Sequence, residues 1–126
     1  MPVPWEFRGS VLVVTTAGHY AYEELDEAVA AAMADPRFRP RMPILFDGSG
    51  SEAILSAADI DRRVDRVVWW ARRGLISRCA MVARREDPHR YGLGRMLSLR
   101  VEAKGLDDLQ ITVFSDVSTA LEWLLS

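Results

Sequence analysis

The chain has 126 residues, the length of one domain, and its composition, 49% hydrophobic and 27% charged, is that of an ordinary globular protein. A net charge of −2 argues against a nucleic-acid partner, and the single cysteine, Cys79, excludes an internal disulfide and CxxC redox or zinc motifs. The N-terminus lacks signal-peptide features and no apolar run approaches the roughly 18 residues of a bilayer span, so we expect one cytoplasmic domain over residues 1–126 that is not membrane-spanning.

Two antiparallel strands and a helix are predicted first along the chain. Alternating apolar and polar residues favour a strand near 4–8, and "VLVVTT" favours a second near 11–16. Gly9-Ser10 between them is typical of a two-residue hairpin turn. Residues 20–34 predict a helix, because their apolar residues fall on one stripe and acids crowd the first turn.

The middle of the chain predicts a buried strand, a polar exit and a long helix. The apolar run 44–46 is typical of a strand buried on both faces. The segment 47–51 then favours a flexible connection. Ser56 is a suitable N-cap for the helix that we expect over 57–73.

The last part of the chain completes an alternation of strands and helices. It predicts a strand at 79–83, a helix over 88–105, a strand at 109–114, and a final helix in 116–125 with Asp116 as its N-cap. The whole order predicts an α/β domain. Its sheet is mixed and mostly parallel, with about five strands, about four helices and an N-terminal antiparallel hairpin.

The stretch "FDGSGSEA" raises the question of a phosphate loop or a nucleophile. A P-loop needs a lysine followed by Ser or Thr where this chain has Glu52, and the dinucleotide motif needs glycine at Ala53. The GxSxG elbow is only partly present, and Ser49 or Ser51 would also need a base, for which His89 is the candidate. We therefore favour a strand exit without catalytic function.

Polar residues follow the carboxyl ends of three predicted parallel strands, where open α/β sheets bind ligands. Arginines beside a helix N-terminus suit an anionic ligand, whereas a solvated surface with balanced charges is the more common reading. The possible ligand crevice comprises Asp47, Ser49, Ser51, Arg84, Arg85, His89, Tyr91 and Asp116. We expect no catalytic residues, no metal site and no cofactor.

The second predicted helix has an unusual outer face. Its apolar stripe comprises Ile60, Val64, Val67, Val68 and Ala71. Trp69 falls nearly opposite, among Arg62, Arg66 and Arg73, and Trp70 falls at the edge of the stripe, where we expect it to be packed. An exposed tryptophan among arginines is typical of an interface hot spot, and the alternative is a cation–π stack under the arginine stems.

Four stretches share their order and spacing with a known family: "GHYAYEELDEAVAAAMADPRFRP", "PILFD", "YGLGRM" and "ITVFSDVSTALEWLL". Together they resemble the SpoIIAA-like family of the STAS/SEC14 superfamily, over nearly the whole chain. The resemblance implies a compact mixed-sheet α/β domain. It also implies kinship with bacterial anti-sigma-factor antagonists, which work by protein–protein contact under phosphorylation control, and more distant kinship with lipid-binding SEC14 domains.

The resemblance also identifies a phosphorylation-site counterpart. In the antagonists, a serine in an Asp-Ser-Ser-Gly context is phosphorylated at the start of the helix after the "LFD"-type strand. Ser56 is the nearest counterpart, but Leu55 precedes it and Ala57-Ala58 follow. We therefore expect that Ser56 is not an efficient phosphorylation switch.

Three functional hypotheses follow from these patterns. The first is a non-enzymatic regulatory or interaction module, a possible homodimer with an unknown protein partner, which an exposed Trp69 without a deep pocket would favour. The second is a binding module for a small apolar or anionic ligand, such as a lipid, which a closed apolar cavity between sheet and helices would favour. The third is an enzyme, which a Ser–His hydrogen bond would favour.

Overall fold

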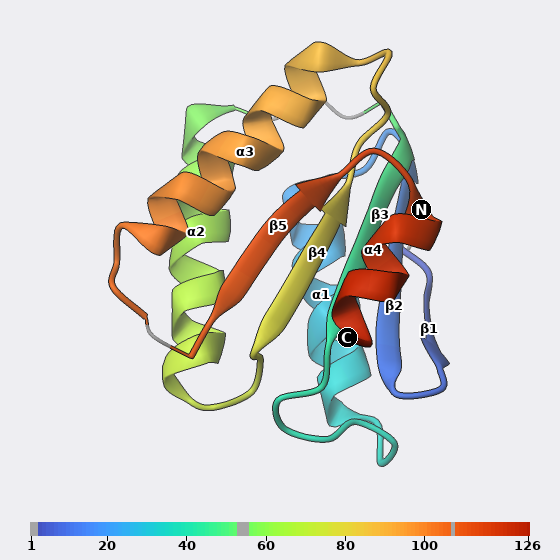
Figure 1. The fold of residues 1–126 in the computed structure, drawn as a ribbon, viewed down its shortest axis with the longest axis vertical. Helices are drawn as coiled ribbons and strands as arrows, with labels where there is room; N and C mark the ends of the chain where they lie inside the picture. Colours follow the sequence, from blue (N-terminus) through green and yellow to red (C-terminus); the bar gives the residue numbers. More distant parts are fainter. Residues whose placement is uncertain (1–2, 53–55, 107) are drawn as a thin grey trace.

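Five strands form one sheet in the order β1-β2-β3-β4-β5 in the computed structural model, which describes residues 3–52, 56–106 and 108–126 (Figure 1). The strands are β1 (Trp5–Arg8), β2 (Val11–Gly18), β3 (Ile44–Ser51), β4 (Arg78–Val82) and β5 (Gln110–Phe114). The helices are α1 (Tyr22–Ala34), α2 (Ala57–Arg72), α3 (Pro88–Glu102) and α4 (Val117–Leu124). β1 pairs with β2 antiparallel and the other pairs are parallel, which confirms the predicted α/β fold class and its N-terminal hairpin.

The sheet is covered on both faces, by three helices on one side and by α4 alone on the other (Figure 1). Leu12 and Val14 point to the side of α1, α2 and α3, and Val11 and Val13 point to α4. This alternation continues through β3 and β4, where all the apolar residues are buried. It explains why the central strands read as continuous apolar runs rather than as alternating ones.

The starts of the helices follow the sequence closely. Ser56 and Asp116 cap α2 and α4 as predicted, and each side chain accepts a hydrogen bond from the backbone N–H three residues on, at 3.1 Å and 2.8 Å. The N-cap of α1 is Ala21, which has no side-chain acceptor. There Glu24 supplies the opposite half of a capping box by accepting from the Ala21 N–H at 3.1 Å.

β3 is longer than the predicted strand at 44–46. The segment 47–51 was expected to be a flexible connection, but it stays in the sheet as far as Ser51, which pairs with Gly18 after a shift in register. Gly48 makes this possible, because a Cβ there would lie 3.0 Å from the carbonyl oxygen of Val82. α3 differs too, since it ends at Glu102 rather than 105. The other predicted bounds agree within two residues.

Candidate functional site

A pocket of about 110 Å³ lies between the sheet and the helices α2 and α3, near the carboxyl ends of the parallel strands. The sheet forms its floor and the two helices form its walls. Most of the lining is apolar. The lining residues are Thr16, Tyr20, Phe46, Gly48, Ser51, Ile60, Arg63, Met81, Val82, Ala83, Arg90, Leu93, Gly94, Leu97 and Val113.

The position of the pocket follows from the strand order. Each parallel strand is added on the same side of the one before it, so the three connecting helices all cover one face. The sheet therefore has no point at which the strand order reverses, which is where open α/β sheets place a crevice. The available space is instead beneath α2 and α3. Gly94 brings α3 close to β5 there, because a Cβ at Gly94 would lie 3.0 Å from Cγ2 of Val113.

Two arginines give the pocket a cationic character, and their surroundings differ. Arg90 forms an ion pair with Asp87, the N-cap of α3, and this hydrogen bond holds the pKa of the Asp87 carboxyl below its usual value. Arg63 is half-buried, and its guanidinium carbon lies 4.4 Å from the centre of the Phe46 ring. The Nε atom of Arg63 is buried and has no hydrogen-bond partner among the described residues.

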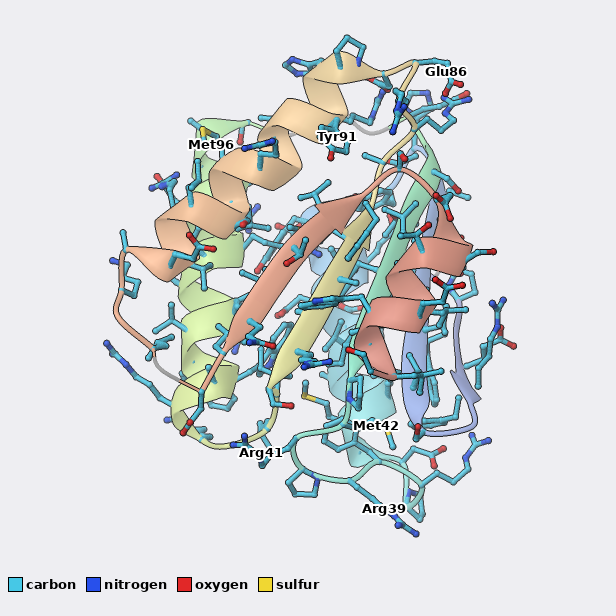
Figure 2. All side chains as sticks on the ribbon, in the orientation of Figure 1. Arg39, Arg41, Met42, Glu86, Tyr91 and Met96 are labelled. Atoms are coloured by element: carbon cyan, nitrogen blue, oxygen red, sulfur yellow. The ribbon has the colours of Figure 1, made fainter. Side chains whose placement is uncertain are left out.

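The predicted crevice residues are distributed over several places. Ser51 lines the pocket, whereas the structure places Asp47, Ser49, Arg84, Arg85, His89, Tyr91 and Asp116 outside the lining. Figure 2 shows Glu86 and Tyr91 at the end of the sheet where β4 leads into α3, with Arg39 and Arg41 at the opposite end. The crevice was expected beyond the carboxyl ends of the parallel strands, whereas the pocket lies beneath α2 and α3.

The candidate nucleophile Ser49 is engaged within its own loop. Its backbone N–H and its hydroxyl both donate to Oδ1 of Asp47, at 3.1 Å and 2.7 Å. His89 is exposed in the first turn of α3, and Nε2 of His19 lies 3.4 Å from a carboxylate oxygen of Glu52. The hydroxyl of Ser49 therefore donates to a carboxylate rather than to an imidazole.

Arg63 was not identified from the sequence, although a signal was present. Positions 60, 63, 64 and 67 fall on one face of a helix, so an arginine at 63 stands within the apolar stripe of α2. Arg62, Arg66, Arg72 and Arg73 surround it in the sequence and make it look like one more exposed charge. The distinguishing feature is its helical phase and not its residue type.

The predicted interface residues lie together on the outer side of α2. Trp69 is 42% exposed, and the guanidinium carbons of Arg73 and Arg66 lie 3.7 Å and 5.5 Å from the centre of its ring system. Arg66 also forms an ion pair with Asp26 of α1 at 3.1 Å. Trp70 is 7% exposed, which agrees with the predicted helix phase.

Arg62 connects α2 to α1 on the same surface. Its guanidinium forms ion pairs with Glu23 and Asp59, and these hydrogen bonds lower the pKa of both carboxyls. The guanidinium carbon also lies 4.4 Å from the centre of the Tyr22 ring. A groove of about 480 Å³ runs here between α1 and α2, with Trp69 at its border.

Other reactive groups are few in the part of the chain that the structure describes. No group of three His, Cys, Asp or Glu side chains there could hold a metal ion. Within the same residues, no helix has the length and apolar character needed to cross a membrane. Cys79 is buried, and burial raises the pKa of its thiol to about 12.

Comparison with known proteins shows similarity to solved structures. No protein-family model and no curated protein matches the chain. A solved structure of an uncharacterized protein of the DUF3478 family from Shewanella loihica PV-4, described as having a SpoIIAA-like fold, superposes with a TM-score of 0.61 over 97% of this chain and 91% of that one. This chain has a SpoIIAA-like fold. The two sequences are 18% identical, so the similarity is one of fold, and it confirms the SpoIIAA-like fold that the sequence resemblance implied.

Within the SpoIIAA-like fold, Ser56 occupies the exposed N-cap of α2. Its hydroxyl oxygen accepts the N–H of Asp59, and the Asp59 carboxylate accepts the N–H of Ser56. The Ser56 side chain therefore serves as half of a capping box at the start of α2.

Proposed function

We propose that this protein is a non-enzymatic binding module for a small molecule with an apolar body, held in the pocket between the sheet and the helices α2 and α3. The pocket itself is the observation that carries the proposal. It lies between the sheet and the helices and is open to solvent rather than closed, and Phe46, Met81 and Leu97 give it apolar walls on three elements.

The size of the pocket limits the ligand and its affinity. A cavity of about 110 Å³ is of the order of one that admits a single benzene ring, for which about 150 Å³ suffices in a known apolar cavity. The best small ligands gain about 1.5 kcal/mol for each non-hydrogen atom. A ligand in an open pocket gains much less than this limit. We therefore expect a dissociation constant on the order of 1 mM for a bare ring, which corresponds to a binding free energy of about 4 kcal/mol.

Methyl NMR during a titration with benzene tests the proposal. We expect saturable shifts of the methyl groups of Leu93, Leu97 and Val113, which line the pocket. Leu93→Trp should fill the space from α3 and weaken binding at least tenfold. Leu99→Trp is the matched control, because Leu99 is on the same helix, 59% exposed and outside the lining, and this variant should bind as the wild type does.

Two results would count against the proposal. One is the absence of saturable shifts in the wild type with benzene and with larger ring compounds. The other is binding that Leu93→Trp and Leu99→Trp weaken equally, because a site outside the pocket would then be responsible.

A second candidate function, an interaction module, is favoured by the exposed Trp69. A large aromatic side chain at the border of a groove and surrounded by arginines is typical of a binding hot spot. Under this candidate the chain forms a homodimer or binds a protein partner through the outer side of α2. Sedimentation of the wild type and of Trp69→Ala tests it, and we expect the variant to dissociate at least tenfold more readily. A wild type that stays monomeric, and that captures partners no better than Trp69→Ala, would exclude this candidate.

A further inference from the structure

Arg63 is a half-buried cation without a counter-ion among the described residues. Several acids of α1 and α2 already serve other arginines, since Asp59 pairs with Arg62, Asp61 with Arg100 and Asp26 with Arg66. Arg63 instead lies over the ring of Phe46, and both residues line the pocket. A guanidinium in this position gives up hydration without gaining an ion pair.

We infer that the ligand of the pocket is a small monocarboxylic acid with a body about the size of one ring, whose carboxylate is bound by Arg63. This assignment rests on the proposed binding function and adds the chemical class of the ligand. An anion at the buried Nε of Arg63 would satisfy a donor that has no other described partner, and would neutralise a charge that the described residues leave uncompensated.

The geometry of arginine favours a carboxylate over larger anions. A guanidinium offers Nε and one Nη as two parallel donors, which match the two oxygens of a carboxylate. A phosphate monoester carries up to two charges and would draw on more than one free cation. The second arginine of the pocket, Arg90, already pairs with Asp87, so Arg63 matches a single negative charge.

The apolar part of the ligand is limited by the same pocket. Leu93 and Gly94 of α3 and Val113 of β5 line it, with Gly94 packed closely on Val113, and the volume is about 110 Å³. A long acyl chain would exceed this space and would need to extend into solvent. A single ring or a short branched chain fits, which separates the expected ligand from a membrane lipid.

Calorimetry with three matched probes tests the inference at pH 7. Benzoate carries the carboxylate, benzamide has nearly the same shape without the charge, and phenyl phosphate carries a larger anion. We expect the wild type to bind benzoate at least tenfold more tightly than benzamide or phenyl phosphate. Arg63→Met should bind benzoate at least tenfold more weakly than the wild type and should bind benzamide equally well. Arg72→Met is the control, because Arg72 is exposed on the same helix outside the lining, and it should not change either affinity.

The outcomes distinguish this inference from the proposed function. Equal binding of benzoate and benzamide, or full retention of benzoate binding by Arg63→Met, would overturn the carboxylate while leaving the pocket as a binding site. Tighter binding of phenyl phosphate than of benzoate would show that the ligand class is a phosphate and not a carboxylate. Failure of all three probes and of benzene would overturn the proposed function as well.

The stability of the ligand-free variant is a second measurement. Because Met keeps the apolar stem and removes the uncompensated charge, Arg63→Met should melt at no lower temperature than the wild type. A clear decrease would mean that the contact between Arg63 and Phe46 serves the stability of the fold, and it would count against a ligand-binding role for this arginine.

Discussion

Trp69 and Trp70 are neighbours in α2 and lie in opposite environments. Trp70 is 7% exposed within the core cluster of the three-helix side, whereas Trp69 is 42% exposed and lies under the guanidinium of Arg73 at 3.7 Å. The helical rotation of about 100° per residue places one on the edge of the apolar stripe and the other beyond it. Two residues of the same type thus differ in what they contribute to the fold.

The first prediction concerns the stability of this pair. Trp70→Ala should lower the free energy of unfolding by about 3–5 kcal/mol, because it leaves a cavity in the core. Trp69→Ala should lower it by less than about 1 kcal/mol, the range of an exposed cation–π contact. Urea unfolding of both variants measures the difference. Equal losses would show that Trp69 is a core residue and that α2 is rotated.

A second prediction compares two glycines of α3. Gly92 has open space around its Cα, so Gly92→Ala should stabilise the protein by about 0.5–1 kcal/mol through helix propensity. A Cβ at Gly94 would lie 3.0 Å from Val113 Cγ2, and the β-branched Val113 has little freedom to move. Overpacking of this kind costs about 1–3 kcal/mol, so Gly94→Ala should destabilise. Chemical denaturation measures the free energy of unfolding of both variants. Stabilisation by both substitutions would contradict the close approach of α3 to β5.

The sequence predicts the features of this protein that neighbouring residues determine, and it does not predict those that depend on contacts between distant segments. Element types follow from local pattern: the run "ILF" is a strand, Ser56 and Asp116 cap helices, and Trp70 is buried, all as expected. The order of the strands depends on contacts between distant segments, and the pocket depends on that order. Ser51 was placed among the possible crevice residues, whereas Arg63 was missed because its position within the apolar stripe is hidden among the exposed arginines of the same helix.

The extension of β3 through "DGSGS" shows the same limit in one segment. Glycine and serine disfavour strands by propensity, which indicated a loop. The neighbouring strand β2 continues to Gly18 and offers backbone partners, so pairing overrides the local preference. Gly48 then fits between β2 and β4, where a larger residue would meet the carbonyl of Val82.

A third prediction follows from the buried thiol of Cys79. Burial raises its pKa from about 9 in an exposed thiol to about 12 in the folded protein. Between these two values the unfolded chain loses the proton and the folded chain keeps it, so the free energy of unfolding should fall as the pH rises from 9 towards 12. Cys79→Ala should lose less stability than the wild type over the same pH range. Urea unfolding at pH 8 and pH 10.5 gives the comparison, and parallel losses would refute the assignment.

The fourth prediction concerns Ser56. Its hydroxyl oxygen already accepts the Asp59 N–H at 3.1 Å, and the sequence around it lacks the acid and the glycine of the antagonists' phosphorylation site. Incubation with an anti-sigma-type kinase and ATP should leave the intact mass unchanged, while a genuine SpoIIAA antagonist in the same reaction gains phosphate. A phosphate mapped to Ser56 would show that the flanking residues are dispensable.

The two-sided covering of the sheet has a consequence for how mutations combine. Leu97 belongs to the cluster under α1, α2 and α3, and Leu124 belongs to the cluster under α4, so the strands separate the two side chains. Substitutions without shared partners add in free energy to within about 0.3–0.5 kcal/mol. Leu97→Ala and Leu124→Ala should therefore behave as independent perturbations. For the same reason, a stabilising substitution under α4 should offset the stability lost by a substitution in the pocket. The lining residues can therefore vary in sequence while the fold is kept.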